Sequence, residues 1–369
     1  MHLIRGKNLP LHAQHSEHRM KYIWWKLISI FILIYVFVFG LLTPLKPGVE
    51  SVSKSTAKAG DSLVLGIKGY NTFFDQASSN RIWLKLDNEH SIEARSSITE
   101  NSTNINATFI IPPFLTADKE VMEATLVIDN DADGAFAYPA ALFISQTSSN
   151  PELGKTMWNA TPKDLHATPY MNFPYRNILG ETIRNTYFHV PLWFGMIILL
   201  ICSAWHSGMF LRNKNRLHDY KAVAYTNVGI LYGMLGLITG AIWAKNTWGQ
   251  YWSFDVKQNM AAISVLIYAA YFVLRGSFED AEKKARISAT YNIFAFFAMI
   301  PLLFVIPRLT ESLHPGNGGN PAFGSQDLDN TMRMIFYPAI VGFTLLGGWM
   351  AQLLWRADSV REKVQEKYS

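Results

Sequence analysis

A short stretch between two apolar segments, WGQYWSFD, combines aromatic rings with one acid. Trp248, Tyr251, Trp252 and Phe254 all precede Asp255 within eight residues. Stacked rings can support a flat conjugated ligand, and a carboxylate where a membrane span begins is costly unless it has a partner. Trp and Tyr are also common anchors at a membrane surface, so composition alone leaves both interpretations of this loop open.

Two histidines flank this loop in the expected topology. His189, in YFHVPLW, stands at the start of one apolar segment, and His314, in LHPG, lies between two later ones. Taken singly, each is typical of an interfacial or turn residue. Neutral imidazole is, however, a usual axial ligand of haem iron. Two imidazoles on either side of a ring resting on the loop, with Trp243 one turn earlier, would make a complete haem site.

Six apolar segments would carry these residues. They cover residues 22–44, 189–209, 222–243, 259–274, 289–306 and 335–355. About 20 helical residues cross a hydrocarbon core, so the segment 259–274 is short and needs its flanks or little tilt. The first segment follows a basic leader. Its length, and the lack of a small-residue cleavage site in LLTPLKPG, favour a retained anchor over a cleaved signal peptide.

The positions of Lys and Arg predict the orientation. Short cytoplasmic loops carry the excess of basic residues, and six spans place both termini on one side. That side also holds the basic residues around 212–221 and 283–286. We therefore expect a multi-pass protein of the bacterial cytoplasmic membrane with both termini in the cytoplasm. The aromatic loop, His314 and everything from 45 to 186 would face the periplasm.

The region before His189 has a different composition. Residues 45–150 contain short segments that alternate apolar and polar residues, such as DSLVLGIKGY and EATLVIDN. This period predicts a small β-sandwich-like domain, and residues 151–186 a Pro- and Asn-rich connector. The expected fold is an all-α membrane bundle of about six transmembrane helices with an inserted extracytoplasmic β-sandwich-like domain. Its parts are residues 1–44 (leader and first helix), 187–356 (five helices) and 357–369 (cytoplasmic tail).

Composition excludes several kinds of site. The single cysteine, Cys202, allows neither a disulfide within the chain nor a Cys-based zinc site. The net charge of +5 is clustered beside apolar segments without a recognition motif, so we expect no nucleic-acid binding. DNDADG, residues 129–134, imitates half of an EF-hand loop, but its twelfth position is Ala140. A hairpin turn is the better interpretation.

Together, these motifs resemble the haem-handling proteins of cytochrome c biogenesis. AIWAKNTWGQYWSFD is similar to their tryptophan-rich WWD signature, YFHVPLW and LHPG to the histidine segments around it, and LRGSFEDAEKKAR to the cytoplasmic loop that follows. Six spans, with the signature between the third and fourth, resemble the CcmC branch more than the larger synthetases. The resemblance covers most of residues 182–356. Tyr251 and Phe254 stand where the family has tryptophans, and about 140 residues are inserted before His189.

The resemblance implies a site for transiently bound haem b. His189 and His314 would be the axial ligands, and Asp255 would orient a ring N–H or a helix end. The binding surface would comprise Trp243, Trp248, Gly249, Tyr251, Trp252, Phe254 and Asp255. Candidate partners of the propionates are the outer cations Arg184, Lys245, Lys257, Arg308 and Arg333. Snorkelling to the membrane surface is the alternative role of each cation.

The resemblance also implies a function and partners. We expect a transfer protein, not an enzyme, that works in membrane lipid with a periplasmic haem chaperone of the CcmE type, an ABC-type haem release complex and a small membrane subunit. One alternative is a haem–cytochrome c synthetase, although such relatives carry more spans and a further histidine pair, and here His206 is the one histidine inside a span. Another is a transporter or receptor with a periplasmic ligand-binding domain, whose spans would show broken helices and buried charges.

Overall fold

The computed structural model describes residues 23–168, 170–314 and 328–368, and these divide into two compact units. One unit is helical and comprises Met1–Leu42 and Thr182–Ser369, and the other is Thr43–Glu181. The basic leader and residues 315–327 of the loop after His314 lie outside the described residues. Each unit is described by itself.

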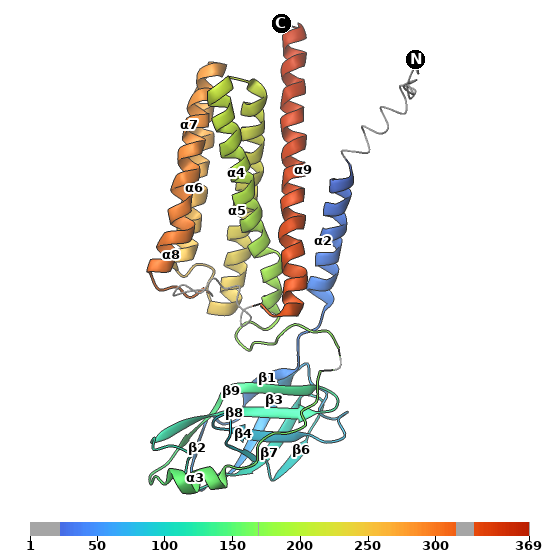
Figure 1. Cartoon of the computed structure of the whole chain (residues 1–369), viewed down its shortest axis with the longest axis vertical. Coiled ribbons are helices and arrows are strands. Elements are labelled where there is room, and N and C mark those ends of the chain that lie inside the picture. Colours follow the sequence, from blue (N-terminus) through green and yellow to red (C-terminus); the bar gives the residue numbers. More distant parts are fainter. Residues whose placement is uncertain (1–22, 169, 315–327, 369) are drawn as a thin grey trace, which may run out of the picture. The chain divides into compact units, whose positions relative to one another are not determined.

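The helical unit contains six helices long and apolar enough to cross a membrane, which confirms the predicted number of spans. They are α2 (Trp24–Leu42), α4 (His189–Asn213), α5 (Arg216–Trp248), α6 (Val256–Gly276), α7 (Ala281–Ile300) and α9 (Asn330–Tyr368) (Figure 1). A 3-10 turn, η1 (Gly180–Tyr187), leads into α4. After α7 the chain continues through a π-helical turn, η2 (Pro301–Val305), into the short α8 (Ile306–Leu309).

The helices extend beyond the apolar segments because polar residues cap them. Asn215, Asp255 and Asp280 each accept a hydrogen bond from a backbone N–H in the first turn of the helix that follows. The segment 259–274, expected to be short, therefore lies in a helix of 21 residues that begins at Val256. No unusual tilt is needed to explain its length.

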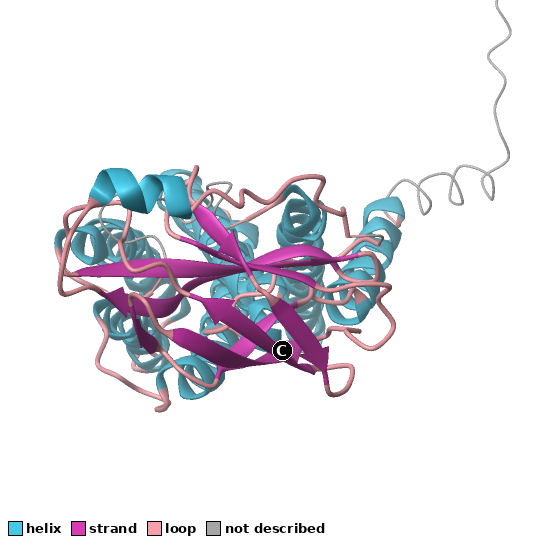
Figure 2. Cartoon of the chain, turned by 90° about the horizontal axis from the view of Figure 1, so that it is seen from below, coloured by secondary structure: helices cyan, strands magenta, loops and turns pink. Residues whose placement is uncertain are grey.

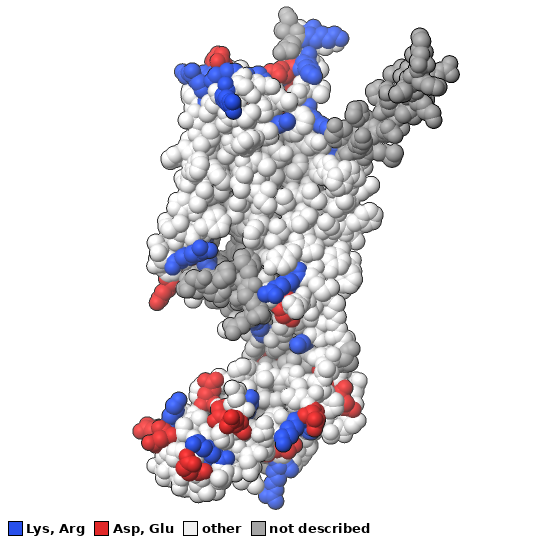
Figure 3. Space-filling model, in the orientation of Figure 1, with Lys and Arg blue, Asp and Glu red and all other residues white. Residues whose placement is uncertain are grey.

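The side of the helical unit is largely uncharged, as its white surface in Figure 3 shows. We call the end where α4 turns into α5, and α6 into α7, the basic end, since Lys and Arg gather there. The core between the helices includes Met196, Leu200, Val228, Tyr232 and Tyr268. Successive helices run in opposite directions, so His189, Trp248 and Asp255 all come to the end away from the basic end.

The second unit consists of two β-sheets (Figure 2). The four-stranded sheet has the order β1 (Gly48–Val52), β3 (Ser62–Tyr70), β7 (Asn104–Ile110), β6 (Ser96–Thr99). The five-stranded sheet has the order β2 (Thr56–Lys58), β9 (Gly134–Ser145), β8 (Val121–Asn130), β4 (Arg81–Lys85), β5 (Ser91–Glu93). Neighbouring strands are antiparallel except β2 and β9. Alternate side chains of both sheets, such as Leu65, Phe109 and Leu126, share one core, as the period-2 pattern predicted.

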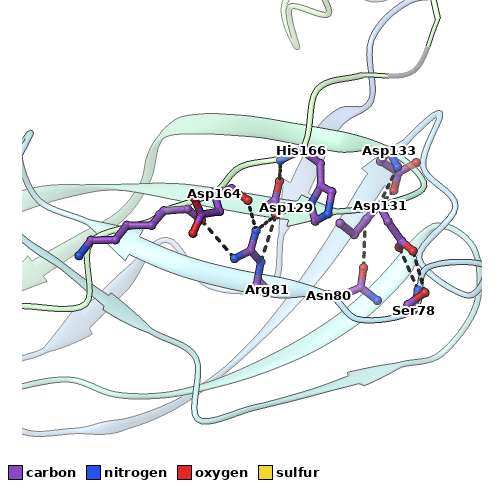
Figure 4. Close-up of polar contacts among 10 residues, drawn as sticks. Ser78, Asn80, Arg81, Asp129, Asp131, Asp133, Asp164 and His166 are labelled. Carbon is purple, nitrogen blue, oxygen red and sulfur yellow. Dashed lines mark hydrogen bonds and ion pairs between the residues drawn. The ribbon is translucent and has the colours of Figure 1, made fainter.

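Residues predicted as a connector lie within this unit. The short helix α3 (Pro151–Met157) is followed by Trp158, which is fully buried in the core between the sheets. Further on, residues 163–166 are fastened to the five-stranded sheet (Figure 4). The Asp129 carboxylate accepts hydrogen bonds from Arg81 Nε at 3.1 Å and from the N and Nδ1 of His166 at 2.7 and 2.9 Å. Arg81 also donates to the Asp164 carbonyl at 2.7 Å.

The DNDADG stretch forms the predicted hairpin between β8 and β9, with Gly134 at φ +78°. Its carboxylates all have protein partners. Asp129 binds Arg81 and His166, Asp131 accepts from Ser78, and Asp133 accepts from the Phe73 N–H. Because each acid is already engaged, the stretch does not offer the free oxygens that calcium requires.

Candidate functional site

His189 is the first residue of α4, and its ring lies against α5. Its Nδ1 is 3.0 Å from the hydroxyl oxygen of Thr239. That hydroxyl has one proton, which it donates to the Leu235 carbonyl at 2.8 Å. Thr239 must therefore accept the bond from His189 Nδ1–H, which places the lone pair of the neutral imidazole on Nε2. This is the nitrogen that could bind a metal.

Gly240 makes this approach possible. A Cβ atom built on Gly240 would lie 2.7 Å from Cε1 of His189, closer than packed atoms tolerate. Gly240 follows Thr239 directly, so the hydrogen bond and the close contact come from the same turn of α5. A glycine at this position therefore lets the imidazole rest directly on the helix backbone.

His314 is held by a different element, the N-terminus of α6. Its Nδ1 is 2.8 Å from Oδ1 of Asp255. A carboxylate only accepts hydrogen bonds, so Nδ1 is the donor and Nε2 again carries the lone pair. Asp255 Oδ2 also accepts from the Leu313 N–H at 2.7 Å, and Oδ1 from the Ser312 hydroxyl at 3.1 Å. One acid thus fixes the three residues that end in His314.

Asp255 also begins α6, accepting a hydrogen bond from the Lys257 N–H at 2.9 Å. The bonds expected of this residue, to a ring N–H and to a helix end, are both present. Burial acts to raise the pKa of Asp255, but the hydrogen bonds from His314 and Leu313, the charge of His314 and the Ser312 bond outweigh it. The pKa of Asp255 is therefore held well below its usual value, and the group is a carboxylate at neutral pH.

Two tryptophans surround the His314 ring. The Trp248 ring centroid lies 4.7 Å from that of His314, and the Trp243 centroid lies 5.9 Å from it. The two indoles meet edge to face at 4.9 Å. Trp243 is one turn beyond Gly240 on α5, so the two imidazoles lie at successive turns of one helix. The structure thus brings together His189, His314, Trp243, Trp248 and Asp255.

The remaining loop residues differ in how far they are exposed. Gly249 ends α5 in the left-handed region, at φ +83°. Tyr251 and Phe254 are 60% and 79% exposed, so their rings are open to solvent or lipid. Trp252 is half-buried. Gln258 anchors the loop by accepting hydrogen bonds from the N–H and hydroxyl of Ser253, both at 3.0 Å.

Three of the candidate cations have protein partners of known geometry. Lys245 donates to the Gly249 carbonyl at 2.8 Å and stands 5.8 Å from the Tyr251 ring. Arg184 donates to the Gly40 carbonyl at 3.1 Å. Arg333 lies 3.4 Å from the Asn330 side chain. Of these three, Lys245 is the one that contacts a ring of the aromatic loop, so it is the best placed of the three to meet an anionic ligand.

Several residues of the site escaped the sequence analysis. Thr239 and Gly240 contact His189 although they lie about 50 positions later in the sequence. Ser312, in the loop that ends in His314, donates a hydrogen bond to Asp255. A signal for the first two was present, since GLITG places small residues one turn apart on an otherwise bulky apolar helix. The sequence predicts His206 as the one histidine inside a span, but a further histidine lies within a long helix. His218 lies in α5, with its Nδ1 2.8 Å from that of His206, because the Asn215 cap starts that helix early.

Two nitrogen atoms therefore define what the site can do. In both histidines Nδ1 donates to a protein oxygen, which leaves the lone pair of the neutral ring on Nε2. Imidazoles that bind metals are usually oriented in this way, through a second hydrogen bond that fixes the tautomer. With two indoles beside His314, the pair suits a flat ligand with a metal at its centre. Among the described residues no cluster of three or more His, Cys, Asp or Glu offers a bare-ion site.

Comparisons with known proteins identify the family of this chain. The sequence model of the family described as Heme exporter protein C matches residues 166–369. The chain is 24% identical over 187 residues to Heme exporter protein C of Bradyrhizobium diazoefficiens, covering 50% of this chain and 70% of that protein. It is 24% identical over 179 residues to the protein of that name from Escherichia coli K12 (48% and 70%). A stretch of 62 residues is 44% identical to the cytochrome c biogenesis protein CcsA of a Synechococcus strain (17% and 20%).

Proposed function

Since the chain belongs to the Heme exporter protein C family, we propose that it binds haem at the outer face of the cytoplasmic membrane and passes it on for cytochrome c maturation. Haem here is a cargo that must be both taken up and released. His189 and His314 would be its axial ligands through their Nε2 atoms. Trp243 and Trp248 would support the porphyrin, with Tyr251, Trp252 and Phe254 at its margin.

The observation that carries this proposal is the shared orientation of the two imidazoles. Each has its Nδ1–H committed to a protein oxygen, Thr239 for His189 and Asp255 for His314. A committed Nδ1–H makes Nε2 a better ligand and removes the need to choose a tautomer when the metal arrives. Both residues also lie at the end of the helices away from the basic end, which the distribution of Lys and Arg assigns to the outside.

The two ligands are held in ways that suit transient binding. His189 lies in the first turn of α4 and against the backbone of α5 at Gly240. His314 lies outside any helix and is held by a few hydrogen bonds, from its ring and Leu313 to Asp255 and from its own N–H to the Ser312 hydroxyl at 3.2 Å. Breaking a few hydrogen bonds takes far less free energy than repacking a helix. We propose that His314 is the ligand that leaves when haem moves to a periplasmic chaperone of the CcmE type.

The release would involve an ABC-type complex, and the sheet unit would serve as a docking or spacing module for a partner. The chain itself would form no covalent bond. Its own residues hold the imidazoles, orient their lone pairs and provide the aromatic surface, which is what a carrier requires.

The test is the visible spectrum of the full chain purified in detergent with haem. We expect a Soret band typical of two imidazole ligands, retained haem lowered about tenfold or more by His189→Ala or His314→Ala, and none in the double variant. His166→Ala is the matched control, since this imidazole also binds a carboxylate but lies in the sheet unit. A Soret band of wild-type intensity in the double variant would overturn the assignment.

A further inference from the structure

A cavity of about 320 Å³ opens in the helical unit towards the basic end. Trp25 near the start of α2, His206 in the last two turns of α4 and Lys221 near the start of α5 lie on its wall. The remaining lining residues are Tyr225, Thr344, Leu345, Gly348, Gln352 and Trp355. The cavity shares no residue with the site around His189 and His314. Its volume is several times that of a water molecule.

The wall formed by α9 contains polar atoms that lack partners. Thr344 Oγ1 and Gln352 Oε1 are buried and make no hydrogen bond. These residues are eight apart, so both face the cavity from one side of α9, with Gly348 between them. A Cβ atom built on Gly348 would meet no atom within 4 Å. These two oxygens are themselves closed off, so the open surface of this wall lies at Gly348, where there is room for a ligand.

The charges around the cavity are positive. Lys221 Nζ lies 5.2 Å from the centre of the Trp355 ring, and the Arg356 guanidinium lies 5.5 Å from the same ring. Lys26 Nζ lies 5.7 Å from the Trp25 ring. None of the residues that line the cavity is an acid. The site therefore favours an anion, and the indoles hold the cations around it.

His206 forms part of the wall. Its Nδ1 faces Nδ1 of His218 at 2.8 Å, and its ring stacks on Tyr225 with centroids 5.8 Å apart. Its nearest polar neighbour is therefore another imidazole, and the remaining lining residues supply no further metal ligand of the His, Cys, Asp or Glu type. The cavity is not built for a metal.

The location indicates the class of ligand. Trp, Lys and Arg at the ends of membrane helices lie at the level of the lipid headgroups, and basic pockets between helices on the cytoplasmic side bind anionic headgroups. We propose that this cavity binds the headgroup of an anionic phospholipid, with phosphatidylglycerol as the representative. The phosphate faces Lys221, and the rest of the headgroup lies over the open surface at Gly348. The bound lipid bridges α2, α4, α5 and α9.

The test is native mass spectrometry of the delipidated full chain with phosphatidylglycerol and with phosphatidylcholine of the same acyl chains. We expect selective retention of one phosphatidylglycerol, weakened about fivefold by Lys221→Gln and recovered in Lys221→Arg. Gly348→Phe, which fills the cavity without removing a polar group, abolishes it, and Gly348→Ala reduces it. Lys283→Gln is the control, because its Nζ also stands over a ring, Phe278 at 5.4 Å, but outside the cavity.

Three results would overturn the proposal. Equal retention of both lipids would show that the headgroup is not recognised, and unchanged retention in Gly348→Phe would place the lipid elsewhere. Displacement of the lipid by inorganic phosphate or by haem at equal concentration would assign the cavity to a soluble anion or to the cargo. Size-exclusion profiles and helical circular dichroism of the variants distinguish lost binding from lost folding. The outcome does not depend on the haem site, because none of these variants touches it.

Discussion

The pairing of a carboxylate with an imidazole occurs in both units of this chain, in different surroundings. Asp129 and His166 meet at 2.9 Å in the sheet unit, and Asp255 and His314 at 2.8 Å in the helical unit. Asp129 is also bound by the Arg81 guanidinium, and the His166 side chain is 47% exposed. The other donors to Asp255 are neutral, and the His314 side chain is 21% exposed beside two indoles.

The two pairs differ in their surroundings. At Asp129 the charge is balanced by arginine, and the contacts fasten residues 163–166 to the sheet. At Asp255 the carboxylate accepts hydrogen bonds from the imidazole and from neutral donors, and the charge of Lys257 also acts on it. The first arrangement stabilises the fold, and under the proposed function the second orients Nε2 of His314 beside two indoles.

The largest effect that would test this contrast is on stability. Asp129→Asn leaves Arg81 without its acidic partner. We expect the free energy of unfolding of the sheet unit to fall by about 2–3 kcal/mol. This is at the low end for a broken ion pair, because the Arg81 side chain is partly exposed. Faster amide hydrogen exchange in β4 and β8 of the full chain would report it. Haem retention should stay at the wild-type level. A loss of haem with unchanged exchange would reverse the roles assigned to the two pairs.

The matching change at the other pair should weaken haem binding. Asp255→Asn removes the charge that supports His314. We expect haem affinity to fall about 10- to 100-fold, as it does when other residues that hydrogen-bond a metal ligand are replaced. Titration of the purified chain with haem, followed at the Soret band, measures it, and Asp129→Asn is the control. Wild-type affinity in Asp255→Asn would mean that this carboxylate serves only to cap α6.

A smaller, purely steric change should act on His189. Gly240→Ala places a methyl group 2.7 Å from Cε1 of His189, so the ring must turn away from Thr239. We expect about tenfold weaker haem binding, with the helix itself slightly favoured, since alanine is the better helix former. Gly208→Ala in α4 is the control, because no atom lies within 4 Å of its Cβ position. Equal haem affinities of Gly240→Ala and Gly208→Ala would show that His189 takes no part in haem binding.

The smallest effect concerns pH. The pKa of Asp255 is lowered in the fold from an ordinary value of 3.8, so its contribution to stability is complete above 3.8 and is lost as pH falls through the lower folded value. We expect the difference in unfolding temperature between wild type and Asp255→Asn, measured without haem, to be constant from pH 8 to pH 5 and to shrink below about pH 4. A difference that disappears between pH 8 and pH 5 would contradict this.

Local patterns in the sequence were sufficient to predict the number of spans and the sheet-rich region. Hydropathy over about 20 residues identifies a helix that crosses a membrane, and period-2 alternation identifies a half-buried strand. Both signals are local, and the structure confirms six spans and two sheets. The caps at Asn215 and Asp255 set helix ends that hydropathy could not locate, because a polar first turn contributes nothing to an apolar average.

The partners within the site could not be predicted from local patterns. The contact between His189 and Thr239 depends on which faces of α4 and α5 meet, and half a turn of either helix about its axis would separate them. Residues 158–166 gave no strand or helix period, yet Trp158 lies in the core and His166 binds Asp129, 37 positions away. Long-range packing of irregular chain leaves no periodic signal.

The π-helical turn at Pro301–Val305 joins α7 to the short helix α8, from which the chain continues to His314. Such a turn holds one residue more than an α-helical turn. The wider turn absorbs the extra residue, so deleting one residue there would leave the segment behind it nearly in place. Deleting one residue from the regular α-helical part of α7 would instead swing Leu309 and the segment behind it through about 100° around the axis. His314 would then point away from Asp255, although every residue of the site would still be present.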